Sequence, residues 1–173
     1  DPWSCLALAG ALRRRAARLG IERIRVHVPP DDPFARFGTR FGSEHRTAYP
    51  SNSGSMGRII RLAPLFRKLL PTFTGRLGDA EVRWERPLEL HTDIGTVCLN
   101  HVSGCVVLSR MPPAQRPLRV SLPILKLTQL AFGYRAVADI SHDAGVSIPG
   151  AALPILDVLF PVGTPYMWWS DRF

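Results

Sequence analysis

The stretch LRVSLPILKLTQLAFGYRAVADISHDAGVSIPGAALPILDVLFPVGTPYMWWSDRF, residues 118–173, decides the fold of this chain. Apolar residues alternate over 118–122, which predicts a strand with one buried face. Pro123 then opens a helix, because its missing N–H would have no partner in a first turn, and Gly133 suits the end of that helix. The apolar spacing of residues 152–159 predicts a further helix.

The last eight residues are rich in aromatic side chains, with Tyr166, Trp168, Trp169 and Phe173 ahead of the terminal carboxylate. Chain ends are usually polar and poorly ordered. We therefore expect this end to dock into the body of the protein and to form one wall of a pocket.

The composition is that of a globular chain with an excess of positive charge. The 173 residues are 46% hydrophobic and 21% charged, and 22 lysines and arginines outnumber 14 acidic residues. No segment is long and apolar enough to cross a bilayer, so no membrane span is predicted. The arginines within 13–18 share a helix with an apolar stripe and have no aromatic residues between them, which favours solvated helix faces and no nucleic-acid partner.

The three cysteines are an odd number without a paired motif, which argues against a disulfide framework and for a reducing, cytoplasmic location. Cys98, His101 and Cys105 invite a metal interpretation. A structural zinc ion needs four ligands, however, and no second pair follows. We therefore favour small buried side chains and predict no metal site.

Over the first 49 residues, helices and strands are predicted to alternate: helix 2–19, strand 24–28, helix 33–41 and strand 44–49. An aspartate and a proline open each of the two helices. Phe34, Phe37 and Phe41 are expected to form the buried edge of the second. The turn formers YPSNSGS at 49–55 mark the boundary between two domains.

The domains are predicted to comprise residues 1–53 and 54–173. The second is predicted to be α+β, with a mostly antiparallel sheet covered on one face by helices. Its expected elements before residue 118 are strand 56–60, a helix over 62–70 stopped by Pro71, a hairpin over 88–99 and strand 106–108.

The segment PPDDPFARFGTRFGSEHRT, residues 29–47, together with the elements around it, resembles the second half of a GNAT acetyltransferase fold. GNAT enzymes hold the pyrophosphate of acetyl-CoA on backbone N–H groups of a glycine-rich loop ahead of a helix. The first helix here begins DPWSCLALAGAL, and no such loop precedes it. The chain itself is therefore expected to bind no cofactor.

Three blocks then follow in order: MGRIIRLAPLF at 56–66, LTQLAFGYRAVADI at 127–140 with HDAG after it, and LDVLFPVGTPYMWWSDRF at 156–173. They resemble the sterol carrier protein-like domain that ends acetyltransferases of the enhanced intracellular survival (Eis-like) family. In that family two GNAT-like regions precede this domain, and only the first binds acetyl-CoA. The resemblance implies the C-terminal part of an N-acetyltransferase, whose partner is a missing N-terminal GNAT domain with acetyl-CoA as cosubstrate.

The family ends in an aromatic residue whose terminal carboxylate acts as a general base, and Phe173 occupies that place here. A positioned carboxylate can take the proton that an acceptor ammonium must lose before it attacks a thioester. The resemblance places the catalytic tyrosine acid in the missing domain. We also expect an amine-bearing small molecule or peptide as acceptor, and a homo-oligomer.

Aromatic and charged side chains are expected to bind the acceptor, and they are Trp84, Phe132, Tyr134, Trp168, Trp169, Asp171 and Arg172. Family members that acetylate polyamine antibiotics carry acidic residues beside the terminal aromatic, whereas Arg172 stands here, with Asp171 before it. An arginine at the pocket mouth repels a polycation and attracts carboxylate or phosphate groups. The sequence thus predicts an acceptor that is not strongly cationic.

Two other functions also fit the sequence. Sterol carrier-like folds can enclose an apolar tunnel, so the chain could bind a lipid or another hydrophobic ligand along the same aromatic residues. It could also be a purely structural or oligomerisation domain. Asp139, His142 and Asp143 lie beside a predicted helix end, where such residues commonly cap or face solvent, and we assign them no catalytic role.

Overall fold

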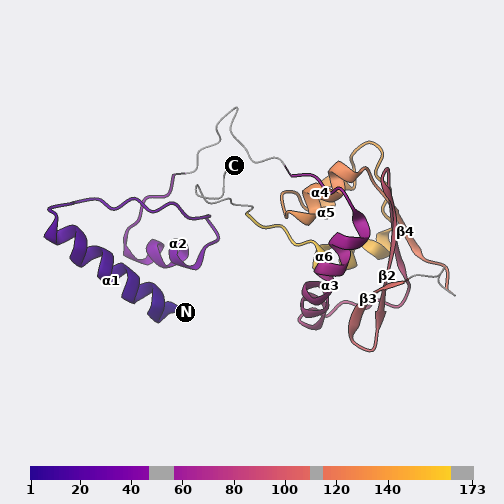
Figure 1. Ribbon diagram of the computed structural model, residues 1–173, viewed down its shortest axis with the longest axis horizontal. Helices are drawn as coiled ribbons and strands as arrows, with labels where there is room; N and C mark the ends of the chain where they lie inside the picture. Colours follow the sequence, from indigo (N-terminus) through magenta and orange to yellow (C-terminus); the bar gives the residue numbers. More distant parts are fainter. Residues whose placement is uncertain (47–56, 110–114, 165–173) are drawn as a thin grey trace. The chain divides into compact units, whose positions relative to one another are not determined.

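The computed structural model describes residues 1–46, 57–109 and 115–164 (Figure 1). The chain divides into two compact units, one of residues 1–55 with 164–173 and one of residues 56–163. The domain boundary expected between residues 53 and 54 lies outside the described residues.

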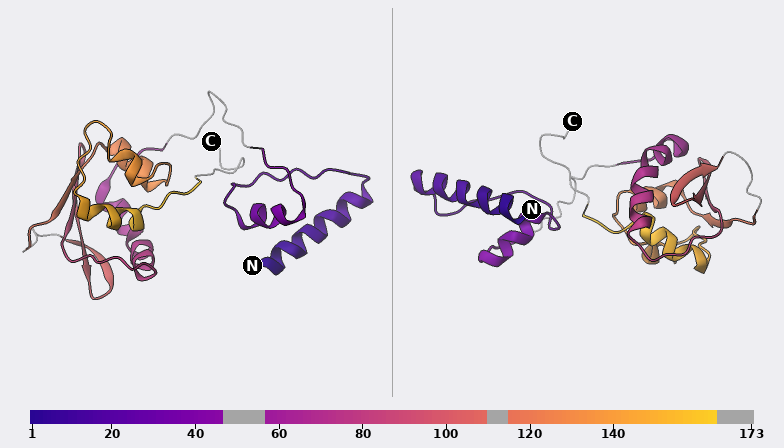
Figure 2. Two further views of the ribbon diagram at one scale, coloured as in Figure 1. Left: turned by 180° about the vertical axis from the view of Figure 1, so that it is seen from behind. Right: turned by 90° about the horizontal axis from the view of Figure 1, so that it is seen from below.

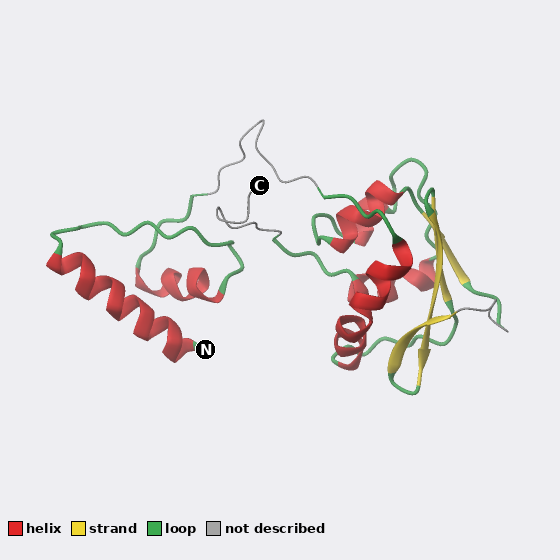
Figure 3. Ribbon diagram, viewed as in Figure 1, coloured by secondary structure: helices red, strands yellow, loops and turns green. Residues whose placement is uncertain are grey.

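The described part of the first unit consists of short helical elements joined by open chain (Figure 3). These elements are α1 at Pro2–Arg18, α2 at Pro33–Gly38 and the 3-10 turn η1 at Thr39–Phe41. Asp1 accepts from the N–H of Trp3 at 2.9 Å, and Asp32 accepts from the N–H of Phe34 at 2.7 Å. These caps satisfy N–H groups that a first turn leaves without partners, and both predicted helix starts are confirmed.

Two expectations for the first unit were wrong, and a third lies partly outside the described residues. Residues 24–28 do not form a strand, because no described residue pairs with them. Phe41 is exposed rather than buried, although its ring lies 4.9 Å from that of Phe37. Residues 44–46 are irregular, and the remainder of the predicted strand 44–49 is outside the described residues.

The second unit contains a four-stranded mixed sheet with helices on one face (Figures 1 and 2). The strands are β1 at Leu88–Thr92, β2 at Gly95–Val102, β3 at Cys105–Ser109 and β4 at Leu118–Ser121. The helices are α3 at Leu62–Gly78, α4 at Ile124–Ala131, α5 at Val137–Ile140 and α6 at Leu153–Leu159, with the 3-10 turn η2 at Gly150–Ala152.

The strand order in the sheet is β3-β2-β1-β4. β2 runs antiparallel to both β1 and β3, whereas β4 runs parallel to β1. A parallel neighbour needs a crossover connection, which here passes through β2 and β3. The α+β prediction is confirmed.

One face of the sheet forms the floor of the core. Two rows of paired side chains cross it, and all are buried: Leu99, Leu88 and Leu118 in one row, and Val97, Leu90 and Val120 in the other. Because strand side chains alternate between faces, Glu89 and Arg119 point the other way. They form an ion pair there at 2.7 Å.

The helix predicted to stop at Pro71 instead continues to Gly78 as α3. Proline removes a hydrogen bond to the carbonyl four residues earlier, which here belongs to Arg67. Arg67 and Pro71 are both exposed, so water can reach that carbonyl. Phe73 and Leu77 are buried in the turns beyond, and their packing outweighs the local cost of the proline.

The start of α4 is fixed by a residue distant in sequence. Pro123 offers no side-chain acceptor, and Asp93, in the β1–β2 turn, accepts from the N–H of Ile124 at 2.5 Å. Thr128 of the same helix donates to the carbonyl of Ile124 and accepts from the N–H of Ile59. Residues 57–60 are held in this way without forming the strand predicted over 56–60, which was wrong for the described part.

Replacing Asp93 with alanine is expected to lower the free energy of unfolding by about 1–2 kcal/mol, because the N–H of Ile124 loses a charged acceptor. Urea unfolding followed by circular dichroism measures the loss. Asp157→Ala is the control, since Asp157 is exposed on α6 and makes no side-chain hydrogen bond within the described residues. It should change stability by at most about 0.5 kcal/mol. Equal losses in both variants would show that the cap does not stabilise α4.

Candidate functional site

The aromatic C-terminal end leaves the second unit at a fixed point on the surface. Gly133 ends α4 with a φ of 67°, and its carbonyl accepts from the N–H of Gly163 at 2.9 Å. The fit is close, because a Cβ at position 133 would lie 2.9 Å from the Gly163 nitrogen and 3.1 Å from the Pro161 carbonyl oxygen. Phe160, just before, is buried against Phe66 and Phe73. The chain is thus anchored up to Gly163.

Two predicted acceptor-binding residues flank this anchor. Phe132 and Tyr134 are 55% and 65% exposed. The Phe132 ring lies directly over the backbone of Gly57, where an added Cβ would be only 2.7 Å from the ring. The N–H of Tyr134 donates to the Gln129 carbonyl at 2.8 Å. Both rings therefore lie at the surface, next to the point from which the aromatic end departs.

Trp84 lies elsewhere, on the segment before β1, and is only 6% exposed. Its indole stacks on His101 at 6.1 Å between ring centroids and donates from Nε1 to the Arg86 carbonyl at 2.7 Å. The two rings border a surface hollow of about 270 Å³, which Asn100 and Gln115 also line. The structure therefore does not bring Trp84 into ring contact with Phe132 or Tyr134 in the described part of the chain.

This hollow offers recognition groups rather than a reactive pair. Glu85 and Arg86 lie at its edge, and the buried Oδ1 of Asn100 has no hydrogen-bond partner within the described ranges. The Arg86 guanidinium donates to the carbonyls of Arg116 and Pro117, which holds it in place. Neither Glu85 nor His101 makes a side-chain hydrogen bond to another described residue, so no nucleophile and base are paired here.

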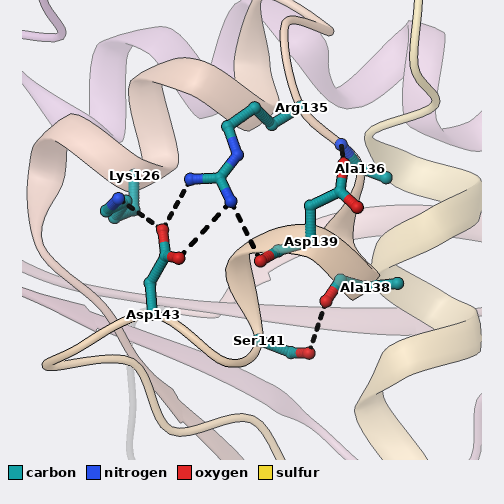
Figure 4. A network of polar contacts seen from close by, with 7 residues as sticks. All are labelled: Lys126, Arg135, Ala136, Ala138, Asp139, Ser141 and Asp143. Carbon is teal, nitrogen blue, oxygen red and sulfur yellow. Dashed lines mark hydrogen bonds and ion pairs between the residues drawn. The ribbon is translucent and has the colours of Figure 1, made fainter.

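A group of charged side chains beside α5 forms a polar network of several linked hydrogen bonds (Figure 4). Asp143 Oδ2 accepts from both Arg135 Nη1, at 2.6 Å, and Lys126 Nζ. Arg135 Nη2 also donates to the Asp139 carbonyl at 3.0 Å, and the Asp139 carboxylate accepts from the N–H of Ala136 at the start of α5. The network ties α4, α5 and the turn after α5 together.

The same contacts fix the charges in this network. The hydrogen bond from Arg135, followed by that from Lys126, lowers the pKa of Asp143 to about 2. The hydrogen bond to Asp143 in turn raises the pKa of Arg135. A carboxylate that stays ionised between two cations cannot exchange protons near neutral pH. Asp143 therefore serves as an ion-pair partner, and Asp139 caps the start of α5.

No metal site is found among the residues that the structure describes. Cys98 lies opposite Ser109 and Cys105 opposite Val102, so the two thiols sit at different levels of the β2–β3 ladder. No group of three histidine, cysteine or acidic side chains converges within these residues. Burial, with the nearby charge of Glu89, raises the pKa of Cys98 and keeps it a thiol. No described helix has the length and apolar character needed to cross a membrane.

The other predicted site residues, namely Trp168, Trp169, Asp171, Arg172 and Phe173, lie outside the described residues. Sequence reasoning missed the role of His101 beside Trp84 and the cations that hold Asp143. Lys126 and Arg135 are 17 and 8 residues from Asp143, and no periodic spacing relates them. A cluster of this kind has no signal in a single sequence.

Asp143→Asn is expected to lower the midpoint of thermal unfolding at about pH 6 and to have less effect in acid. The folded-state pKa of about 2 lies below that of the unfolded chain. The stabilisation is therefore complete above about pH 4 and is lost as the pH falls toward about 2. Across this pH range, the difference in the midpoint of thermal unfolding between wild type and variant should become smaller as the pH falls. Asp157→Asn should run parallel to wild type, and a pH-independent effect of Asp143→Asn would refute the assignment.

Gly133→Ala should lower the free energy of unfolding by about 1–3 kcal/mol, because the positive φ and the backbone of Gly163 both oppose a side chain. Gly75→Ala provides a matched control inside α3. Nothing lies within 4 Å of a Cβ placed there, so alanine should add up to about 1 kcal/mol through helix propensity. Guanidinium unfolding measures both. A change of the same sign in the two variants would contradict the close fit at Gly133.

Comparisons of the chain with known protein families, with characterised proteins and with solved structures found no match. The α+β class rests on the structure itself. The GNAT-like and sterol carrier-like assignments remain predictions.

Proposed function

We propose that this chain is the acceptor-binding, C-terminal portion of an acetyl-CoA-dependent N-acetyltransferase of the enhanced intracellular survival type. Residues 1–53 correspond in this proposal to the end of a GNAT-like region and residues 54–173 to the sterol carrier-like domain. Acetyl-CoA binds to a separate N-terminal GNAT domain, and this chain alone transfers no acetyl group.

One observation carries the proposal. The chain is anchored at Gly163, whose N–H donates to the carbonyl of Gly133, and the residues on either side of Gly133, Phe132 and Tyr134, are exposed. Ten residues separate Gly163 from the terminal carboxylate of Phe173. A fully extended chain of that length spans at most about 35 Å. A chain of that length is long enough for the proposed base to act on an acceptor bound beside Phe132 and Tyr134.

The proposed chemistry needs one base from this chain. The carboxylate of Phe173 accepts the proton that the acceptor ammonium loses, and the free amine attacks the thioester carbon of acetyl-CoA. A carboxylate from which water is excluded is a stronger base, because desolvation disfavours its charged form. The acid that protonates the leaving thiolate comes from the N-terminal domain.

The residues beside the terminus set the charge preference of the proposed pocket. Arg172 disfavours a polycationic acceptor, unless Asp171 neutralises its charge. We therefore propose an amine-bearing acceptor with a neutral or anionic remainder. A panel of amines given to the complete enzyme tests this proposal. A preference for aminoglycosides, which are polycationic, would contradict it.

Lipid binding in an internal tunnel receives less support. The rings of Phe66, Phe73 and Phe160 meet at 5.3–6.4 Å between centroids, and all three are buried. Such packing fills the space between α3 and the end of α6 with side chains. A purely structural role is compatible with the ion-paired network at Asp143.

Moving the terminal carboxylate tests the proposed base. Adding two glycines after Phe173 in the enzyme that includes the acetyl-CoA-binding region should lower kcat by about 10²–10⁴-fold, because the base is displaced. Phe173→Tyr keeps an aromatic terminus and should retain most of the activity. Steady-state kinetics with a saturating amine measures kcat. An extended enzyme with unchanged kcat would exclude the terminal carboxylate as base.

A further inference from the structure

We draw no further inference here: the strongest candidate, the surface hollow of about 270 Å³ that Trp84 and His101 border between the segment before β1 and strand β2, has Gln115 at its edge, next to residues 110–114, which lie outside the described residues, so nothing in the structure shows what occupies or covers it.

Discussion

The apolar side of the four-stranded sheet has to be removed from water, and this requirement organises the second unit. Leu88, Leu90, Leu99 and Val120 are inaccessible to solvent beneath the helices. Burying each such side chain contributes on the order of 1.5–3 kcal/mol. Burial alone does not choose a position for each helix, however, because apolar surfaces attract without direction.

Directional contacts supply the positions that burial leaves open. Thr74 on α3 accepts from the N–H of Val106 on β3, and Arg76 on the same helix donates to the carbonyl of Leu159 at the end of α6. Asp93 fixes the start of α4 in the same manner. All three bonds join a side chain to a backbone group of another element. Each would be lost if its helix shifted along the sheet, so the bonds determine register while burial supplies the driving force.

The sequence predicted those elements in which pattern and backbone chemistry agree. Residues 118–133 combine strand alternation, a proline at a helix start and a glycine at a helix end, and the structure follows all three signals. Pro71 failed as a stop signal because burial of Phe73 and Leu77 outweighs one missing hydrogen bond. Residues 24–28 failed for a different reason, since a strand exists only with a neighbour, and alternation cannot show whether one is present.

The candidate site was predictable in composition but not in geometry. Aromatic residues mark apolar surface, yet Trp84 is buried against His101 while Phe132 is exposed, and nothing in their sequence neighbourhoods distinguishes the two. The exposure of an aromatic side chain depends on which other elements of the chain pack against it. For the same reason the sequence did not predict the ion pairs of Asp143, whose partners come from α4 and from the segment before α5.

The two units also differ in how far they can stabilise themselves. In the described part of the first unit only Ala16 and Ala35 are buried among the apolar residues, while Trp3, Leu6 and Leu8 of α1 remain exposed. Two alanines contribute roughly one to two kcal/mol, whereas ordering each residue of a helix costs about that much in backbone entropy. Most of the stability of helices in proteins comes from packing of an amphipathic face rather than from helix propensity. Stable order in α1 therefore requires an apolar surface beyond the described residues of its own unit, a requirement that the well-filled core of residues 57–163 does not share.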